Sequence, residues 1–117
     1  MDAKKLRGRE GEAEAARYLR KKGYKIVGQN YSCRFGEVDI IAEGGGYVVF
    51  AEVKLRKNAD FAQAREFVTA AKQEKIKKAA SMWLAANETV LQPRFDVIEI
   101  YSGGTEAGIS HIENAFE

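Results

Sequence analysis

Several residue types are scarce in this sequence, and each shortage excludes a class of structure or chemistry. There is one cysteine, Cys33, among 117 residues, so no internal disulfide can form, and a reducing compartment is indicated. We expect Cys33 to be an unreactive loop residue. The single histidine, His111, stands between apolar residues, where we expect a structural role rather than a metal ligand. No glycine-rich phosphate loop precedes a helix in the Walker pattern.

Long apolar runs are also absent. The longest run is far shorter than a membrane span, and no apolar segment follows the basic residues at the N-terminus. We therefore expect a cytoplasmic protein with no membrane partner. The length of 117 residues, with 45% apolar and 31% charged residues, predicts one ordinary soluble globular domain spanning residues 1–117.

The net charge of +2 is small, but the charges are unevenly distributed. Residues 1–25 hold nine Lys or Arg against four acids, whereas the residues after Val90 hold only Arg94 against five acids. Such an asymmetry could direct one end of the molecule at a polyanion. Solvated helix faces explain the same distribution equally well.

The most informative stretch is residues 35–56, which reads as two β-strands joined by glycines. Three ionisable residues, Asp39, Glu52 and Lys54, stand inside its apolar runs. Burying an unpaired charge would cost several kcal/mol. A divalent cation held by Asp39 and Glu52, with Lys54 beside it, offsets that cost most simply.

The turn between these two strands decides whether the acids can meet. Glu52 and Lys54 share one face of the second strand because side chains alternate with period two. Asp39 lies opposite Glu52 only if a two-residue turn is made at Gly45 and Gly46. A loop of three glycines would place Asp39 on the other face, unless a bulge restored the phase.

Two helices are predicted on either side of this hairpin. The first covers about residues 2–22 and ends at Gly23, and its inward stripe includes Glu12, which either reaches solvent or supplies a third acid. We favour the third acid, binding a metal directly or through water. The second runs from the N-cap Thr69 to about residue 87.

Other residues are placed to touch a substrate or to serve the fold. Lys72 and Gln73 begin the inward stripe of the second helix, where unpaired N–H groups favour anions, and they are either phosphate contacts or structural polar groups. Further candidates for nucleic-acid contacts are Arg34, in a loop predicted at 30–36, Lys75, and Arg56 at the end of the second hairpin strand. Residues 57–65 lack periodicity and predict a loop that either closes on substrate or is a plain connection.

Three more strands complete the order of elements. They are expected at residues 24–29, 94–102 and 109–112, with a break at Pro93. Asp96 is expected to cap or to pair with Arg94. The order is helix, three strands, helix, two strands, which predicts an α/β or α+β domain with a central mixed sheet flanked by helices. The second helix allows the fourth strand to pair parallel to an earlier one.

These motifs together resemble a known family. Asp39 followed by Glu52-Val53-Lys54 resembles the D…(E/D)xK signature of the PD-(D/E)XK nuclease superfamily, with Val38 in place of the proline in that name. The blocks GREGEAEAARYLRKKGY, N-x5-GEVDIIA and VVFAEVKLR, followed by the helix near Lys72, resemble the YraN family of uncharacterised bacterial proteins, which are similar to Holliday-junction resolvases.

The resemblance implies a fold, a reaction and a site. It implies a restriction-endonuclease-like core and a Mg²⁺-dependent endonuclease acting on DNA phosphodiesters, with branched or flapped DNA as one substrate class and Mn²⁺ as a substitute metal. The catalytic residues are then Glu12, Asp39, Glu52 and Lys54, and the acids among them are the metal ligands. Similar resolvases act in pairs, so a homodimer is one expectation. A protein that binds nucleic acid on a nuclease fold without cutting it is the alternative.

Overall fold

The computed structural model describes residues 3–56, 68–101 and 108–117, with the backbone alone for residues 3–8. Two helices and five strands are found in these ranges, and together they form the predicted α+β fold with a mixed sheet. In chain order they are α1 (Ala3–Lys21), β1 (Lys25–Cys33), β2 (Gly36–Gly44), β3 (Tyr47–Arg56), α2 (Ala70–Ala86), β4 (Gln92–Tyr101) and β5 (Gly108–Phe116). The arrangement is consistent with a restriction-endonuclease-like core.

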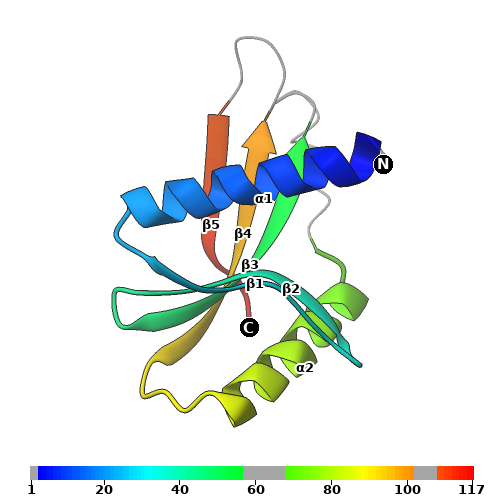
Figure 1. Cartoon of the computed structure of the whole chain (residues 1–117). Helices are drawn as coiled ribbons and strands as arrows, with labels where there is room; N and C mark the ends of the chain where they lie inside the picture. Colours follow the sequence, from blue (N-terminus) through cyan, green and yellow to red (C-terminus); the bar gives the residue numbers. More distant parts are fainter. Residues whose placement is uncertain (1–2, 57–67, 102–107) are drawn as a thin grey trace.

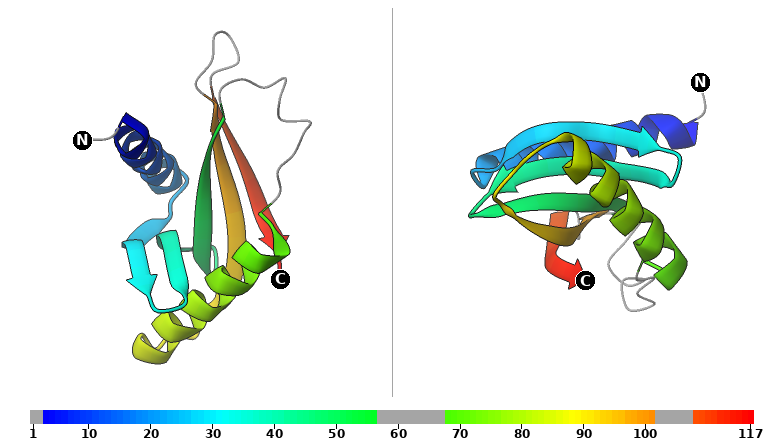
Figure 2. Two further views of the ribbon diagram at one scale, coloured as in Figure 1. Left: turned by 90° about the vertical axis from the view of Figure 1, so that its right-hand side faces the viewer. Right: turned by 90° about the horizontal axis from the view of Figure 1, so that it is seen from below.

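The strands follow one another across the sheet in the order β1-β2-β3-β4-β5. β3 and β4 are parallel, as predicted for a connection that contains a helix, and the other neighbours are antiparallel. The pair β1 and β2 is twisted strongly away from β3, β4 and β5 (Figures 1 and 2). Within the described ranges, no helix is long and apolar enough to cross a lipid bilayer.

α1 ends and α2 begins where the sequence indicates. α1 is followed by Gly23, which adopts a positive φ of 96°, a conformation that glycine tolerates at a helix end. α2 is capped by Thr69, whose side-chain oxygen accepts a hydrogen bond from the backbone N–H of Lys72 at 3.2 Å.

Each helix covers its own face of the sheet and has its own hydrophobic cluster (Figure 2). Alternation along β3 divides the two clusters, because Val48 and Phe50 pack toward α2 whereas Val49 and Ala51 pack toward α1. On α2, Trp83 meets the ring of Phe50 edge-on at 5.8 Å. The buried α1 residues are Ala15, Ala16 and Leu19, and the buried α2 residues are Ile76, Ala79, Ala80 and Trp83.

The turn between β2 and β3 has the predicted length. Gly44 pairs with Tyr47, so the loop consists of Gly45 and Gly46. Both have positive φ, 59° and 86°, which is the geometry of the tight turns that suit the twist of a hairpin. The glycines therefore set a register that runs to Ile40 and Ala51, directly before Asp39 and Glu52 on their strands.

Both outer strands are longer than predicted. β1 continues to Cys33, so the predicted loop at residues 30–36 shrinks to a turn at Arg34 and Phe35, and Cys33 belongs to a strand. Tyr31 and Cys33 pack against the cluster beneath α2, which extends the strand. β5 likewise runs to Phe116, whose ring stacks on Phe95.

Two other predictions concern Pro93 and the loop that follows β3. Pro93 lies inside β4 as its second residue and not at a break before it, a position near a strand start where the missing N–H is tolerated. The predicted loop at residues 57–65 lies outside the described residues.

Candidate active site

The two acids of the hairpin stand where β2 and β3 stop pairing regularly. The register runs from Gly44 and Tyr47 to Ile40 and Ala51, and Asp39 and Glu52 come next on their strands. At this point a side chain replaces the backbone acceptor. Oδ2 of Asp39 accepts a hydrogen bond from the backbone N–H of Val53 at 2.9 Å. The carboxylate of β2 is thereby fixed against β3.

Alternation along β2 also changes at Asp39. Val38 belongs to the cluster beneath α2, whereas Ile40, two residues later, belongs to the cluster beneath α1. In a regular strand, both would face the same side. The strand is therefore distorted at its acidic residue, and this places Asp39 in the opening between the two strands.

Glu52 is buried and Asp39 is half-buried, and the pKa of each carboxyl group is raised. Glu52 is 7% exposed, and burial, followed by the negative charge of Asp39, raises its pKa to about 7. Burial also raises the pKa of Asp39, although the hydrogen bond from Val53 and the charge of Lys72 oppose that rise. Two carboxylates in one poorly hydrated place repel one another, and a cation between them would relieve the repulsion.

Two lysines approach this acid pair from different elements. Lys72, at the start of α2, places its Nζ 3.9 Å from Oε1 of Glu52, which is an ion pair too long for a hydrogen bond. Lys54 of β3 is half-buried, and its charge lowers the pKa of both Asp39 and Glu52. The side chain of Lys54 forms no hydrogen bond or ion pair with any described residue.

Glu12 of α1 faces the same region and is half-buried. Burial and then the charge of Asp39 raise its pKa, while a hydrogen bond from the Asn30 side chain lowers it. Across residues 3–56, 68–101 and 108–117, however, no group of three His, Cys, Asp or Glu side chains is placed to hold a metal ion together. Glu12 therefore lies near the pair without completing a three-acid cluster.

Asn30 contacts Glu12 at the candidate site and was not predicted from the sequence as a site residue. It adopts a positive φ of 52°, which is uncommon for residues other than glycine and is best tolerated by Asn and Asp. This conformation accompanies its interaction with Glu12. The asparagine that begins the motif N-x5-GEVDIIA is the feature of the sequence that could have identified it.

The residues of the site lie within a segment that matches a known protein family. The model of the family described as "Uncharacterised protein family UPF0102" matches residues 11–100. This chain belongs to the UPF0102 family. The resemblance to YraN proteins is thereby confirmed, and the matched segment includes Glu12, Asp39, Glu52 and Lys54.

Relatives from distant bacteria match almost end to end. A UPF0102 protein of Caldanaerobacter subterraneus is 45% identical, over 97% of this chain and 96% of the relative. One from Geobacter metallireducens is 44% identical, over 94% and 91%, and one from Vibrio parahaemolyticus is 41% identical, over 97% and 93%. This UPF0102 protein therefore has the same extent as these relatives.

Two of the predicted phosphate contacts have partners within this UPF0102 protein. The side-chain Nε2 of Gln73 donates to the backbone carbonyl of Val68 at 2.8 Å, which supports the start of α2 and favours the structural alternative. Arg56 donates from Nε to Oε2 of Glu99 at 3.0 Å, and both side chains are largely buried. Neither side chain is brought to the acid pair.

Arg34 and Lys75, two further predicted phosphate contacts, lie together on the surface. Arg34 in the turn between β1 and β2 places its guanidinium 4.8 Å from the centre of the Phe35 ring. Lys75 is exposed on α2 beside this turn, where its Cβ would lie 3.3 Å from a Cβ on Gly36. They form a separate basic surface. Lys72, on the same helix as Lys75, lies near the acid pair.

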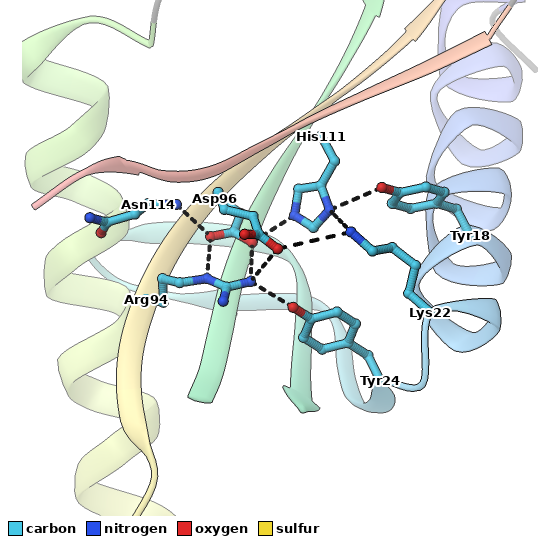
Figure 3. A network of polar contacts seen from close by, with 8 residues as sticks. Tyr18, Lys22, Tyr24, Arg94, Asp96, His111 and Asn114 are labelled. Carbon is cyan, nitrogen blue, oxygen red and sulfur yellow. Dashed lines mark hydrogen bonds and ion pairs between the residues drawn. The ribbon is translucent and has the colours of Figure 1, made fainter. Parts of the chain in front are cut away.

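A second polar cluster lies away from the acid pair, between β4, β5 and α1 (Figure 3). Its centre is Asp96, which is fully buried. The carboxylate accepts hydrogen bonds from Nε and Nη2 of Arg94, at 2.9 and 2.8 Å, and from the backbone N–H of Asn114 at 3.0 Å. Nε2 of His111 lies 2.7 Å from Oδ2. The predicted pairing of Asp96 with Arg94 is confirmed.

This second cluster has the features of a structural core element. Nδ1 of His111 faces the hydroxyl of Tyr18 at 3.2 Å, and Nη2 of Arg94 donates to the hydroxyl of Tyr24 at 2.7 Å. Burial opposes the charge of Asp96, but the hydrogen bonds from His111 and Arg94 lower its pKa below the ordinary value. Both ring nitrogens of His111 have protein partners, so its expected structural role is confirmed.

Proposed function

We propose that this UPF0102 protein is a Mg²⁺-dependent endonuclease that hydrolyses DNA phosphodiester bonds, with branched or flapped DNA as its substrate class. The proposal rests chiefly on Glu52, which is buried, and Asp39, which is half-buried, two carboxylates that come from adjacent strands at the opening between β2 and β3. No donor among the described residues makes a hydrogen bond to Glu52. Such a pair is costly to the fold, and metal-assisted phosphate chemistry is a function that requires it.

The side chains at this opening suit magnesium. Mg²⁺ prefers oxygen ligands and keeps several of its waters, so one or two carboxylates suffice. Asp39 and Glu52 supply those oxygens, the backbone carbonyl of Val53 is a third candidate, and Glu12 acts through water. The chemistry supplied by a bound cation there is neutralisation of the attacked phosphate and acidification of a water. Mn²⁺, with the same ligand preference, substitutes for it.

The residues of the chain then have distinct duties. The hydrogen bond from Val53 holds one oxygen of Asp39 and leaves the other for a ligand. Lys54 stands two positions beyond Glu52 on β3. There its neutral amine would accept a proton from the attacking water, or its ammonium form would position that water or stabilise the negative charge of the phosphorane. Lys72 offers a second positive charge to the phosphate at the edge of the same opening.

The second candidate is a protein that binds nucleic acid without cutting it, and two observations favour it. Lys72 already offsets part of the charge of Glu52, and no third acid joins the pair within the part of the chain that the structure describes. In that case Lys72 and Lys54 hold a phosphate without hydrolysing it. Both candidates predict salt-sensitive binding to nucleic acid, so cleavage is the measurement that separates them.

The first experiment is a cleavage assay with Mn²⁺ or Mg²⁺ on labelled single-stranded, duplex, flap and four-way-junction DNA. We expect cleavage of the branched substrates by the wild type and its loss in Lys54→Ala. Lys77→Ala is the matched control, because Lys77 is paired with Glu74 on the outer side of α2. Symmetric incisions in the junction would indicate that two copies act together.

Three results decide between the candidates. Activity that is abolished in Lys54→Ala and retained in Lys77→Ala supports the nuclease. Activity that persists at the wild-type level in Lys54→Ala comes from a contaminant or from another site, and contradicts the proposal. Binding of DNA without cleavage of any substrate favours the non-cleaving protein.

A further inference from the structure

The turn between β1 and β2 lies against the side of α2, and this contact gathers positive charge (Figure 1). Gly36 follows the turn with a φ of 151°, and a Cβ on it would lie 3.3 Å from the Cβ of Lys75. At this distance the backbone of the strand passes close beside the helix. The turn residues Arg34 and Phe35 are thereby brought next to the lysines of α2.

Two of these cations lie close to the aromatic ring of Phe35. The guanidinium of Arg34 lies 4.8 Å from the centre of its ring, and the Nζ of Lys78 lies 5.9 Å from it. Both distances are within the range of cation–π attraction. The ring therefore holds two like charges near one another, although they would otherwise separate in solvent.

None of Arg34, Lys75 and Lys78 forms an ion pair with an acid among the described residues, and all three are exposed. Lys77, one position away on the same helix, contrasts with them because its Nζ lies 3.4 Å from Oε1 of Glu74. Within the part of the chain that the structure describes, the positive charge beside Phe35 thus has no acidic partner. A surface with this property is suited to a partner that brings its own negative charges.

The lysines of α2 extend from Phe35 toward the acid pair. Lys72, Lys75 and Lys78 follow one another at intervals of three residues, which places them along one side of α2 over about 9 Å of helix axis. Lys72 at one end approaches Glu52, and Lys78 at the other approaches Phe35. One strand of DNA has a phosphate about every 3.4 Å of axis, so this length corresponds to about three phosphates.

We propose that Arg34, Lys75 and Lys78, ordered around Phe35, form a phosphate track that binds the backbone of a nucleic acid and leads it past Lys72 to Asp39 and Glu52. This inference rests on the proposed function for the identity of the polymer. It assigns roles to Phe35 and Lys78 and leaves Arg56 and Gln73 outside the track, because both have partners within the protein.

A lipid surface fits the same charges less well. Basic helices that lie on membranes insert an apolar face, but the apolar face of α2 is buried against the sheet through Ile76, Ala80 and Trp83. Phe35 is partly buried, and its ring is already engaged by Arg34 and Lys78, so it is poorly placed to insert. For the same reason it does not stack on bases, and the track reads phosphates without regard to sequence.

The test measures binding without cleavage. The full chain with Asp39→Asn, in EDTA, is titrated against labelled single-stranded and duplex DNA by fluorescence anisotropy over a range of salt. We compare the triple variant Arg34→Gln, Lys75→Gln, Lys78→Gln with the control Lys77→Gln. The triple variant is expected to bind more than about tenfold more weakly and to lower the slope of log affinity against log salt by about 2 to 3 for duplex DNA. The control should change both quantities by clearly less than about a third as much, which is the share expected if every removed charge counted equally.

A variant that keeps the net charge separates the track from general attraction. Phe35→Leu leaves every charge in place and removes the ring, so we expect weaker binding with circular dichroism and melting that show a folded protein. A loss per removed charge that is as large in Lys77→Gln as in the triple variant would overturn the proposal, because only the net charge would then matter. Unchanged DNA binding with lost binding to phosphatidylserine vesicles would overturn it in favour of a membrane. Since no cleavage is measured, these results are independent of the test of nuclease activity.

Discussion

The carboxylate of Asp39 accepts a hydrogen bond from the backbone N–H of Val53 at 2.9 Å, across the opening where β2 leaves β3. A backbone carbonyl would normally accept from such an N–H in a ladder. Here a side chain replaces it, so the strands can diverge without leaving that N–H unpaired. The same bond orients an acid next to Glu52, which means that the distortion of β2 and the formation of the acid pair have one cause.

This dual role predicts different stabilities for two substitutions at Asp39. Asp39→Asn keeps an oxygen that can accept from Val53 and removes the charge that repels Glu52, so the metal-free protein should be at least as stable as the wild type. Asp39→Ala leaves the N–H without its acceptor, and should be about 1–3 kcal/mol less stable than Asp39→Asn. Urea denaturation in EDTA measures both, and equal stabilities would show that the hydrogen bond contributes nothing.

The raised pKa of Glu52 predicts how stability changes with pH. Between its ordinary value of 4.5 and about 7, the folded protein holds a proton there that the unfolded chain releases, so this group makes the free energy of unfolding fall as the pH rises. Glu52→Gln should therefore be more stable than the wild type at pH about 8, by about 1–3 kcal/mol. The advantage should shrink toward pH about 5. Glu88→Gln, on an exposed side chain, is the control and should show no such trend.

Metal binding should depend on the same two acids. Titration of Mg²⁺ or Mn²⁺ by calorimetry should show binding to the wild type and the loss of most of it in Asp39→Asn. Bound metal also requires Glu52 to be ionised, so binding at pH about 6.5 should release protons, detected as a heat that changes with the ionisation enthalpy of the buffer. Removal of the metal with EDTA should lower the melting temperature of the wild type and leave that of Asp39→Asn unchanged. Equal affinity in both proteins would exclude Asp39 as a ligand.

The central part of this fold could be predicted because its determinants are local. Two glycines fix the turn of the β2–β3 hairpin, and the alternation along β3 then fixes the face of Glu52. Thr69 and Gly23 mark helix ends by the conformations that their residue types favour. Each of these features depends on a few neighbouring residues, and neighbouring residues are visible in a sequence.

The rest depends on contacts between residues far apart in the chain. β1 was predicted too short because Asn30, with its positive φ, interrupts the pattern, although Tyr31 resumes the inward packing afterwards. In β5, Asn114 has the same positive φ of 52°. Gln73 and Arg56 were assigned to phosphate because their partners, Val68 and Glu99, cannot be identified from spacing alone. Whether a polar side chain serves the fold or a ligand is decided by such partners.

The cluster around Asp96 gives the largest expected effect on stability. Its carboxylate joins β4 to β5 through His111 and Asn114, and it neutralises Arg94, whose side chain is 10% exposed. Asp96→Ala leaves that guanidinium and the histidine without their acceptor in a poorly hydrated place, and should destabilise the fold by about 3–5 kcal/mol. Glu113→Gln is the matched control. Glu113 also approaches Arg94, at 3.6 Å, but its side chain is 52% exposed, so its loss should cost no more than about 0.5 kcal/mol.

The pH dependence of this cluster has the opposite sign to that of Glu52. The pKa of Asp96 is lower in the folded protein than its ordinary value of 3.8, so the unfolded chain binds the proton more readily. The stabilisation by Asp96 is therefore complete above pH about 4 and is lost as the pH falls through the lower folded-state pKa. Acid denaturation followed by circular dichroism should show this loss in the wild type and in Glu113→Gln. Asp96→Asn keeps the shape and lacks the titration, so its stability should depend less steeply on pH below about 4. An equally steep dependence would mean that other carboxyl groups cause the acid denaturation.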